Sequence, residues 1–110
     1  MGKHYLLDIY EVDSILLKEL DNFVEFINPT LYDCLAEVLS ESKHKFFTEG
    51  CGYTYLALLS TSHFSIHTWP EHSSAAIDLF TCGEINSEEI IRYVIKYFNP
   101  ANYNLKVVTR

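Results

Sequence analysis

The residues with the strongest chemical character lie in one short stretch, from Ser60 to Glu71, which reads STSHFSIHTWPE. It holds three successive hydroxyl residues, then His67, a tryptophan and a carboxylate, and Cys82 follows in AAIDLFTCG. A serine or cysteine can act as a nucleophile, and a histidine, with an ordinary pKa of about 6.5, can give or take a proton near neutrality. The stretch therefore indicates proton-transfer or covalent chemistry.

Alternation along this stretch predicts how its side chains are placed. His63 to Trp69 alternates as a strand does, which puts His67 and Trp69 on one face and Phe64 and Ile66 on the other. If the strand of AAIDLFTCG pairs alongside, Cys82 comes near the face that carries His67. We therefore expect nucleophile, base and proton donor to meet at one end of a sheet.

The same residue types also have ordinary structural roles. A serine before a strand is most often a turn residue, a strand histidine is most often structural, and a cysteine is most often a small apolar group. A Ser/His/Cys set also suits a hydrolase, although no G-x-S-x-G elbow is present. Spacing alone therefore leaves a catalytic role open.

The elements that must position these residues follow from periodicity. Strands are predicted at His4–Tyr10, Lys43–Thr48, Tyr53–Leu59, His63–Trp69, Ala75–Cys82 and Leu105–Val108. Helices are predicted from Asp13–Ser14 to Ile27, from a restart after Asn28–Pro29 to Leu39, and from Asn86–Ser87 to Phe98. Short connections favour antiparallel pairing, because parallel crossovers need about a dozen residues. We predict one α+β domain over residues 1–110, a two-layer sandwich of a mainly antiparallel sheet with helices packed on one face.

Composition narrows the class of protein. The chain has 110 residues and a formal net charge of −7, without a basic run, so no nucleic-acid partner is expected. No apolar run approaches the roughly 20 residues of a membrane span, so no membrane association is expected. The three cysteines, Cys34, Cys51 and Cys82, contain no C-x-x-C pair. They predict reduced thiols in a cytoplasmic protein and no zinc site.

The two motifs together resemble a known family. SHFSIHTWPE followed by AAIDLFTCG is similar to the signature of prokaryotic S-adenosylmethionine decarboxylases, which reads ESH-x-[ST]-IHTWPE and then AA-[IV]-D-[IL]-FTCG. The N-terminal HYLLDIYEVD also resembles the first strand of that family. The resemblance extends, loosely, over nearly the whole chain.

This resemblance implies a proenzyme that cuts itself between Thr61 and Ser62. In the family, the serine hydroxyl attacks the preceding carbonyl, the amide becomes an ester, and elimination and hydrolysis leave a pyruvoyl group. The expected products are a β chain of residues 1–61 and an α chain of residues 62–110 that begins with the pyruvoyl group. His67 matches the histidine that moves protons during cleavage, and Thr54 stands where the family commonly has a processing serine.

The resemblance also implies the later chemistry. The cofactor is the covalent pyruvoyl group derived from Ser62, which captures the amine of S-adenosylmethionine as a Schiff base, and no metal is expected. Cys82 matches the cysteine that protonates the substrate carbon after CO2 leaves. Glu71 is expected to bind the ribose hydroxyls, with Trp69 and Phe47 lining the site. The product is the aminopropyl donor for polyamine synthesis, and the enzyme is expected to be a homodimer.

Two departures and two alternatives accompany this expectation. Thr61 stands where the family nearly always has glutamate, and His72-Ser73-Ser74 replaces a run of the type aromatic-Gly-aromatic. One alternative is a pyruvoyl-dependent arginine or ornithine decarboxylase of the same fold, although neither substrate has a ribose diol for Glu71. The other is a catalytically silent subunit that regulates an active relative.

Overall fold

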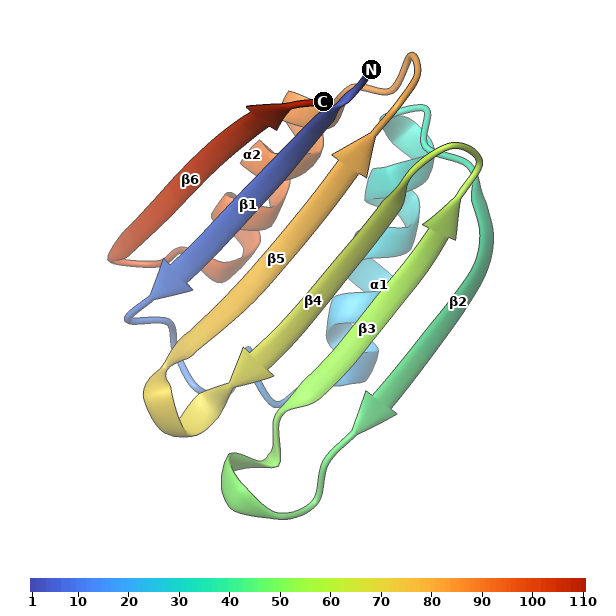
Figure 1. Cartoon of the computed structure of the whole chain (residues 1–110). Coiled ribbons are helices and arrows are strands. Elements are labelled where there is room, and N and C mark those ends of the chain that lie inside the picture. Colours follow the sequence, from blue (N-terminus) through green and yellow to red (C-terminus); the bar gives the residue numbers. More distant parts are fainter.

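Six strands form one antiparallel sheet in the computed structural model, which describes residues 1–110 (Figure 1). The strands are β1 (Lys3–Tyr10), β2 (Val38–Lys45), β3 (Tyr53–Leu59), β4 (His63–Trp69), β5 (Ser74–Thr81) and β6 (Asn102–Thr109), and their order across the sheet is β2-β3-β4-β5-β1-β6. The helices α1 (Leu20–Asp33) and α2 (Ser87–Phe98) both cover one face (Figure 1). Two short 3-10 turns, η1 (Glu49–Cys51) and η2 (Pro70–His72), follow β2 and β4. The predicted α+β sandwich is confirmed.

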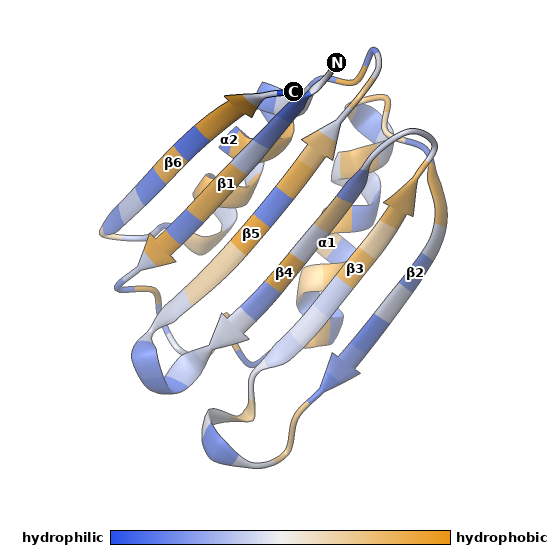
Figure 2. Ribbon diagram, viewed as in Figure 1, coloured by the Kyte–Doolittle hydropathy of each residue, from blue (hydrophilic) through white to orange (hydrophobic).

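Alternation gives the sheet two different faces. In β5 every second residue is buried beneath the helices, and the residues between them are half-buried on the opposite face. Figure 2 shows the same alternation of apolar and polar residues along the central strands. We call the face turned away from the helices the outer face. It carries large exposed apolar side chains, among them Leu56, Leu58 and Trp69.

Aromatic rings from both layers meet at Phe23 of α1. Its ring centroid lies 5.7 Å from that of Tyr53 on β3 and 5.7 Å from that of Phe98 on α2. The Phe64 ring of β4 lies 6.3 Å away and nearly parallel to it. Phe23 is completely buried. Burial of such a side chain stabilises the fold by about 1.5–3 kcal/mol, so this ring helps fix both helices on the sheet.

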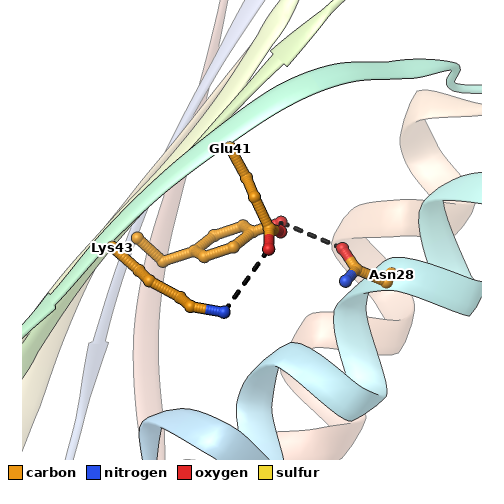
Figure 3. Close-up of polar contacts among 4 residues, drawn as sticks. Asn28, Glu41 and Lys43 are labelled. Atoms are coloured by element: carbon orange, nitrogen blue, oxygen red, sulfur yellow. Dashed lines mark hydrogen bonds and ion pairs between the residues drawn. The ribbon is translucent and has the colours of Figure 1, made fainter.

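A polar cluster ties β2 to β3 and α1 at the rim of this core (Figure 3). The Tyr55 hydroxyl lies 2.9 Å from Glu41 Oε2 and 3.0 Å from Asn28 Oδ1, and Lys43 Nζ donates to Glu41 Oε1 at 3.4 Å. The hydrogen bond from Tyr55, and to a smaller extent Lys43, holds the pKa of Glu41 below its ordinary value. Burial, followed by the neighbouring carboxylate, raises the pKa of Tyr55. The phenol therefore stays protonated and donates to the carboxylate.

The first helix differs from its prediction at both ends. Residues 14–18 form turns, and α1 begins only at Leu20. The Asp13 carboxylate accepts from Ile15 N–H at 3.0 Å, so this predicted cap closes a turn instead. The helix then runs through Pro29 without interruption. A proline has no backbone N–H to donate, and its ring crowds the carbonyl group four residues earlier. Pro29 lies on the exposed side of α1, where water can hydrogen-bond to the carbonyl that lacks a helical partner.

The strand predictions hold in the centre of the sheet and shift at one edge. β3 and β4 have the predicted bounds, and α2 follows its predicted cap Asn86 and ends at Phe98 as predicted. β5 is shifted by one residue at each end. The strand predicted at Lys43–Thr48 is instead β2, Val38–Lys45, and the helix predicted toward Leu39 ends at Asp33. β2 is an edge strand whose residues between its ends are all exposed, so hydrophobic alternation does not mark it.

Candidate active site

Ser62 lies in the tight turn between β3 and β4, directly before β4 begins. The turn is closed by Leu59 N–H, which donates to the Ser62 carbonyl at 2.9 Å. Ser62 is only 7% exposed, and its Oγ accepts a hydrogen bond from the backbone N–H of Cys82 at 3.1 Å. The antiparallel pairing of His63 with Phe80 brings Cys82, two residues beyond Phe80, to this turn. The structure thus brings Ser62 and Cys82 together, as expected.

Cys82 also contacts the residue on the other side of the predicted cleavage site. The Thr61 hydroxyl donates to the Cys82 carbonyl oxygen at 2.5 Å. The Thr61–Ser62 peptide bond is therefore flanked by two hydrogen bonds to one residue of the neighbouring loop. Sequence reasoning did not predict the contact of Thr61.

His67 and Thr54 form a second cluster on the outer face. The two residues are directly opposite each other in the β3–β4 register, and Thr54 Oγ1 lies 2.9 Å from His67 Nδ1. A hydroxyl can donate to a bare ring nitrogen or accept from a protonated one, so this contact orients the imidazole in either state. The other ring nitrogen, Nε2, is then the one available for proton transfer.

These two clusters do not meet within one chain. His67 lies five positions after Ser62 along an extended strand, which at about 3.3 Å per position is about 16 Å. The expectation that serine, histidine and cysteine gather at one end of the sheet is therefore wrong for a single chain. Ser62 and Cys82 occupy one end of β4, and His67 lies near the other. The distance between Ser62 and His67 follows from their spacing in the sequence once the segment is taken as a strand.

A cavity of about 290 Å³ opens beside His67. Trp69, Glu71 and Thr54 line it together with His67, and the ring centroids of His67 and Trp69 lie 6.3 Å apart. Two of the predicted substrate-binding residues, Trp69 and Glu71, thus share one cavity with both residues of the second cluster. Glu49 of η1 adds a second carboxylate to its wall.

Phe46, not Phe47, is the phenylalanine that lines this cavity. The His44 and Phe46 rings lie 4.7 Å apart, so Phe46 continues the outer-face side of β2. Phe47 is 82% exposed and lines a different cavity with Lys18 and Lys45. Adjacent residues in an extended segment point to opposite sides, and the loose loop sequence did not reveal which side each one takes.

The turns above the cavity use unusual backbone conformations. Gly50 has φ +75°, and a Cβ there would lie 2.4 Å from Glu71 Oε1, so only glycine lets η1 approach this carboxylate so closely. Ser73 has φ +51°, in the left-handed region that favours glycine. Ser73 is the middle residue of the departure His72-Ser73-Ser74. Ser73 therefore adopts the left-handed conformation that favours glycine, at the position where the family run has a glycine.

Further ionisable residues gather on the outer face near Ser62. His4 Nε2 lies 3.1 Å from Asp78 Oδ1, and the His63 ring stacks on Phe80 with centroids 5.6 Å apart. The Arg110 guanidinium lies 5.2 Å from the centroid of the same Phe80 ring. Sequence reasoning did not single out His4 or Asp78. Alternation along β1 and β5 predicts that His4 and Asp78 lie on the same face of the sheet. That they are neighbours follows only from how the two strands pair.

The largest cavity, about 640 Å³, lies on the helix side at the start of α2. Lys3, Tyr5 and Glu88 line it, and none of the predicted site residues does. No group of three histidine, cysteine or acidic residues is arranged to hold a metal ion. Neither helix has the length and apolar character of a transmembrane span.

Comparison with known proteins gives one consistent result. Residues 3–110 match the family described as S-adenosylmethionine decarboxylase. The chain is 33% identical to the S-adenosylmethionine decarboxylase proenzyme of Methanococcus aeolicus, with 100% of this chain and 93% of the relative covered. It is 40% identical to S-adenosylmethionine decarboxylase proenzyme 2 of Bacillus cereus, with 99% and 88% covered. The crystal structure of the adenosylmethionine decarboxylase from Aquifex aeolicus superposes with a TM-score of 0.90 at 31% identity, covering 100% of this chain and 90% of that one.

Proposed function

Because the chain belongs to the S-adenosylmethionine decarboxylase family, we propose that it cuts itself between Thr61 and Ser62 and then decarboxylates S-adenosylmethionine. The activity is that of a pyruvoyl-dependent carboxy-lyase, and its product is the aminopropyl donor for spermidine synthesis. The two relatives and the solved structure named above are all S-adenosylmethionine decarboxylases. The comparisons therefore favour this substrate over arginine or ornithine.

The contact between Ser62 Oγ and Cys82 N–H is the observation that carries the cleavage proposal. A fixed hydroxyl can attack the carbonyl carbon of Thr61: an ester C–O bond forms, the C–N bond breaks, and the hydroxyl proton passes to the freed amine. Loss of the Ser62 Cα proton then expels the Thr61 carboxylate and leaves dehydroalanine. Water hydrolyses its imine tautomer, releases ammonia and leaves the pyruvoyl group at position 62.

The surroundings of Ser62 fit a cofactor made in place. The residue is nearly buried and held by the loop of Cys82, so the group formed from it stays at a defined position. When formed, this group supplies a ketone that captures the substrate amine and takes up the electrons released on loss of CO2. Cys82, held against position 62 by its own backbone, returns a proton to the substrate carbon. A thiol suits this task because its ordinary pKa is about 8.5.

Substrate recognition is assigned to the cavity beside His67. The Glu71 carboxylate can accept hydrogen bonds from both hydroxyls of a ribose, and an aromatic wall of Trp69 and Phe46 suits an adenine ring. The carboxylates of Glu71 and Glu49 favour a substrate that carries a positive sulfonium. Arginine and ornithine share the cation but have no diol to satisfy Glu71.

The separation of the two clusters supports a homodimer with shared sites. A two-fold axis between two outer faces, perpendicular to the strands, reverses the strand direction and lays the Ser62 end of one copy over the His67 end of the other. Each site would then combine Ser62 and Cys82 of one copy with His67, Thr54 and the cavity of the second copy. Exposed Leu56 and Leu58 on the same face provide apolar surface for such packing.

Intact mass spectrometry tests the self-cleavage directly. Incubation should convert the 12.7 kDa chain into two chains, of residues 1–61 and 62–110, the second bearing a carbonyl at its first residue. The purified product should release CO2 from S-adenosylmethionine faster than from arginine or ornithine. A folded sample that stays whole, with a free serine at position 62, would contradict the proposal and favour the silent-subunit alternative.

Complementation tests the shared site. Ser62→Ala and His67→Ala are each expected to block cleavage when expressed alone. Co-expressed with different tags, they form mixed dimers in which one site has both Ser62 and His67, so the His67→Ala chain alone should be cut. The control is Ser62→Ala with Cys82→Ala. Both losses fall in the same half-site, so CO2 release should not rise above the low level of Cys82→Ala alone. If no cleavage appears in mixed dimers confirmed by both tags, the shared site is wrong.

A further inference from the structure

The Thr61 hydroxyl is the one side chain that ties the N-terminal side of the scissile bond to the rest of the site. It donates to the Cys82 carbonyl at 2.5 Å, while Cys82 N–H donates to Ser62 Oγ at 3.1 Å. We propose that Thr61 is a positioning residue for self-cleavage, which holds its own carbonyl group in place for attack by Ser62. This inference rests on the proposed function, because it concerns the rate of the cut described above.

The geometry of the attack explains why such an anchor is needed. The nucleophile and the carbonyl carbon belong to adjacent residues, so the alignment depends on rotations of the peptide unit between them. The hydrogen bond to Ser62 fixes only the nucleophile. The hydrogen bond from Thr61 fixes the preceding residue against the same partner, and the branched Cβ of threonine leaves its side chain few alternative rotamers. Both ends of the reacting peptide unit are thereby held against Cys82.

Gly83 makes room for this contact. A Cβ at Gly83 would lie 3.1 Å from Thr61 Oγ1, closer than most side chains tolerate, and its φ of +156° suits glycine. Thr61 is otherwise exposed in its turn, so the hydroxyl has no other reason to be ordered. The contact thus depends on a threonine in one loop and a glycine in the next.

The same position also distinguishes this chain from the usual signature. An ionised glutamate has no proton to donate and cannot make the hydrogen bond that Thr61 makes to a carbonyl oxygen. The anchor described here therefore belongs to this sequence. From the sequence alone, a β-branched residue at the cleavage site is expected to restrict the backbone and slow self-cleavage. The hydrogen bond that Thr61 makes in the structure points instead to faster cleavage.

The test compares cleavage rates of purified or freshly translated proenzyme by denaturing gel and intact mass. Thr61→Val keeps the branched shape and removes the donor, and it should slow cleavage about tenfold, the effect of one modest hydrogen bond on a barrier. Thr61→Ser keeps the donor and should cleave within about threefold of the wild type, since only a methyl group is lost. The matched control is Ser60→Ala in the same exposed turn, whose hydroxyl makes no hydrogen bond to the protein, and its rate should be unchanged.

A second measurement separates positioning from general damage. Hydroxylamine cleaves the ester that forms after the attack, so it should not restore the rate of Thr61→Val if the attack itself is slowed. Restoration of the wild-type rate by hydroxylamine would place Thr61 in a later step and overturn the inference. Chains of Thr61→Val that have been fully cut should show a kcat and KM within about twofold of the wild type, because the anchor acts before the cut.

The outcomes distinguish this inference from the proposed function. If the wild type cleaves and Thr61→Val cleaves equally fast, the inference is wrong and the enzyme assignment stands. If the folded wild type never cleaves, the proposed function itself fails. If Thr61→Val does not fold, Thr61→Ala takes its place in the comparison. Equal cleavage rates for Thr61→Ala and Thr61→Ser would then overturn the inference.

Discussion

Single residues in this protein gain their chemical character from the neighbours that the register provides. Cys34 is buried, and burial, followed by Glu89 and Asp33, raises the pKa of its thiol and leaves it structural. Cys82 is half-buried and lies against Ser62 through its backbone. Two cysteines of one chain thus lie in different surroundings, and only Cys82 contacts the proposed cleavage site.

Replacement of Cys82 should separate cleavage from turnover. Cys82→Ala keeps the backbone groups that contact Ser62 and Thr61, so self-cleavage should continue. Loss of the proposed proton donor should lower kcat for S-adenosylmethionine by about 10²–10⁴-fold, the usual contribution of a positioned acid. Steady-state CO2 release on fully cut protein measures this effect. Unchanged kcat would remove Cys82 from the proton transfer.

Replacement of Glu71 should affect substrate binding more than chemistry. Glu71→Gln keeps the shape but weakens the hydrogen bonds to a diol, so KM should rise about tenfold or more, with kcat nearly constant. The control is Glu25→Gln on the exposed side of α1, which should leave both constants unchanged. A rise in KM that is equally large for a deoxyribose analogue of the substrate would contradict the diol contact.

At the scale of elements, one face of the sheet is fixed by packing and the other is left for chemistry. Apolar alternation in β3, β4 and β5 commits one side to the helices, and the intervening side chains then face outward together. The outward row on β3 and β4 includes Thr54 and His67, which pair across the strands. Formation of the core therefore also sets the register of the polar residues on the outer face.

The cluster at Glu41 makes an element-scale prediction about pH. The pKa of Glu41 is lowered in the folded protein, so its stabilisation is present above the ordinary glutamate pKa and is lost as the pH falls through the lowered value. Tyr55→Phe removes the main cause and should lower the free energy of unfolding by about 1 kcal/mol at neutral pH, a modest value because Glu41 is partly exposed. The difference between variant and wild type should shrink below about pH 4. Urea unfolding at several pH values measures it, and a difference that grows in acid would reverse the assignment.

The sequence was most informative where alternation and burial coincide. The bounds of the central strands and of α2 were predicted nearly to the residue. The proximity of Cys82 to Ser62 was also predicted. Exposed or irregular segments gave weaker signals: β2 lacks an apolar face, and α1 tolerates Pro29 on its solvent side. Which of two adjacent phenylalanines lines the cavity depends on a loop whose course local sequence does not fix. The contact of Thr61 required the meeting of two loops that are distant in the chain.

At the scale of the whole molecule, the exposed apolar side chains of the outer face and the separation of the Ser62 and His67 clusters both favour pairing of two copies. Leu58→Glu places a charge on this face, near the Ser62 end of β3, where the wild-type side chain is 51% exposed. We expect the variant to sediment as a monomer of 12.7 kDa and to cleave much more slowly, because each chain then lacks the His67 of a second copy. The control is Tyr32→Glu, on the solvent side of α1 and 81% exposed, which should remain dimeric and active. Full cleavage by a monomeric Leu58→Glu protein would contradict the shared site.

The strand order has a consequence for the proposed cut between Thr61 and Ser62. Residues 1–61 hold β1, β2 and β3, and residues 62–110 hold β4, β5 and β6, yet β1 is inserted between β5 and β6. The two polypeptides left by such a cut would be interleaved, and neither could dissociate without breaking the hydrogen-bond ladders on both sides of β1 and the one between β3 and β4. We therefore expect scission to open the backbone beside Ser62 while the tertiary structure persists as a two-polypeptide assembly.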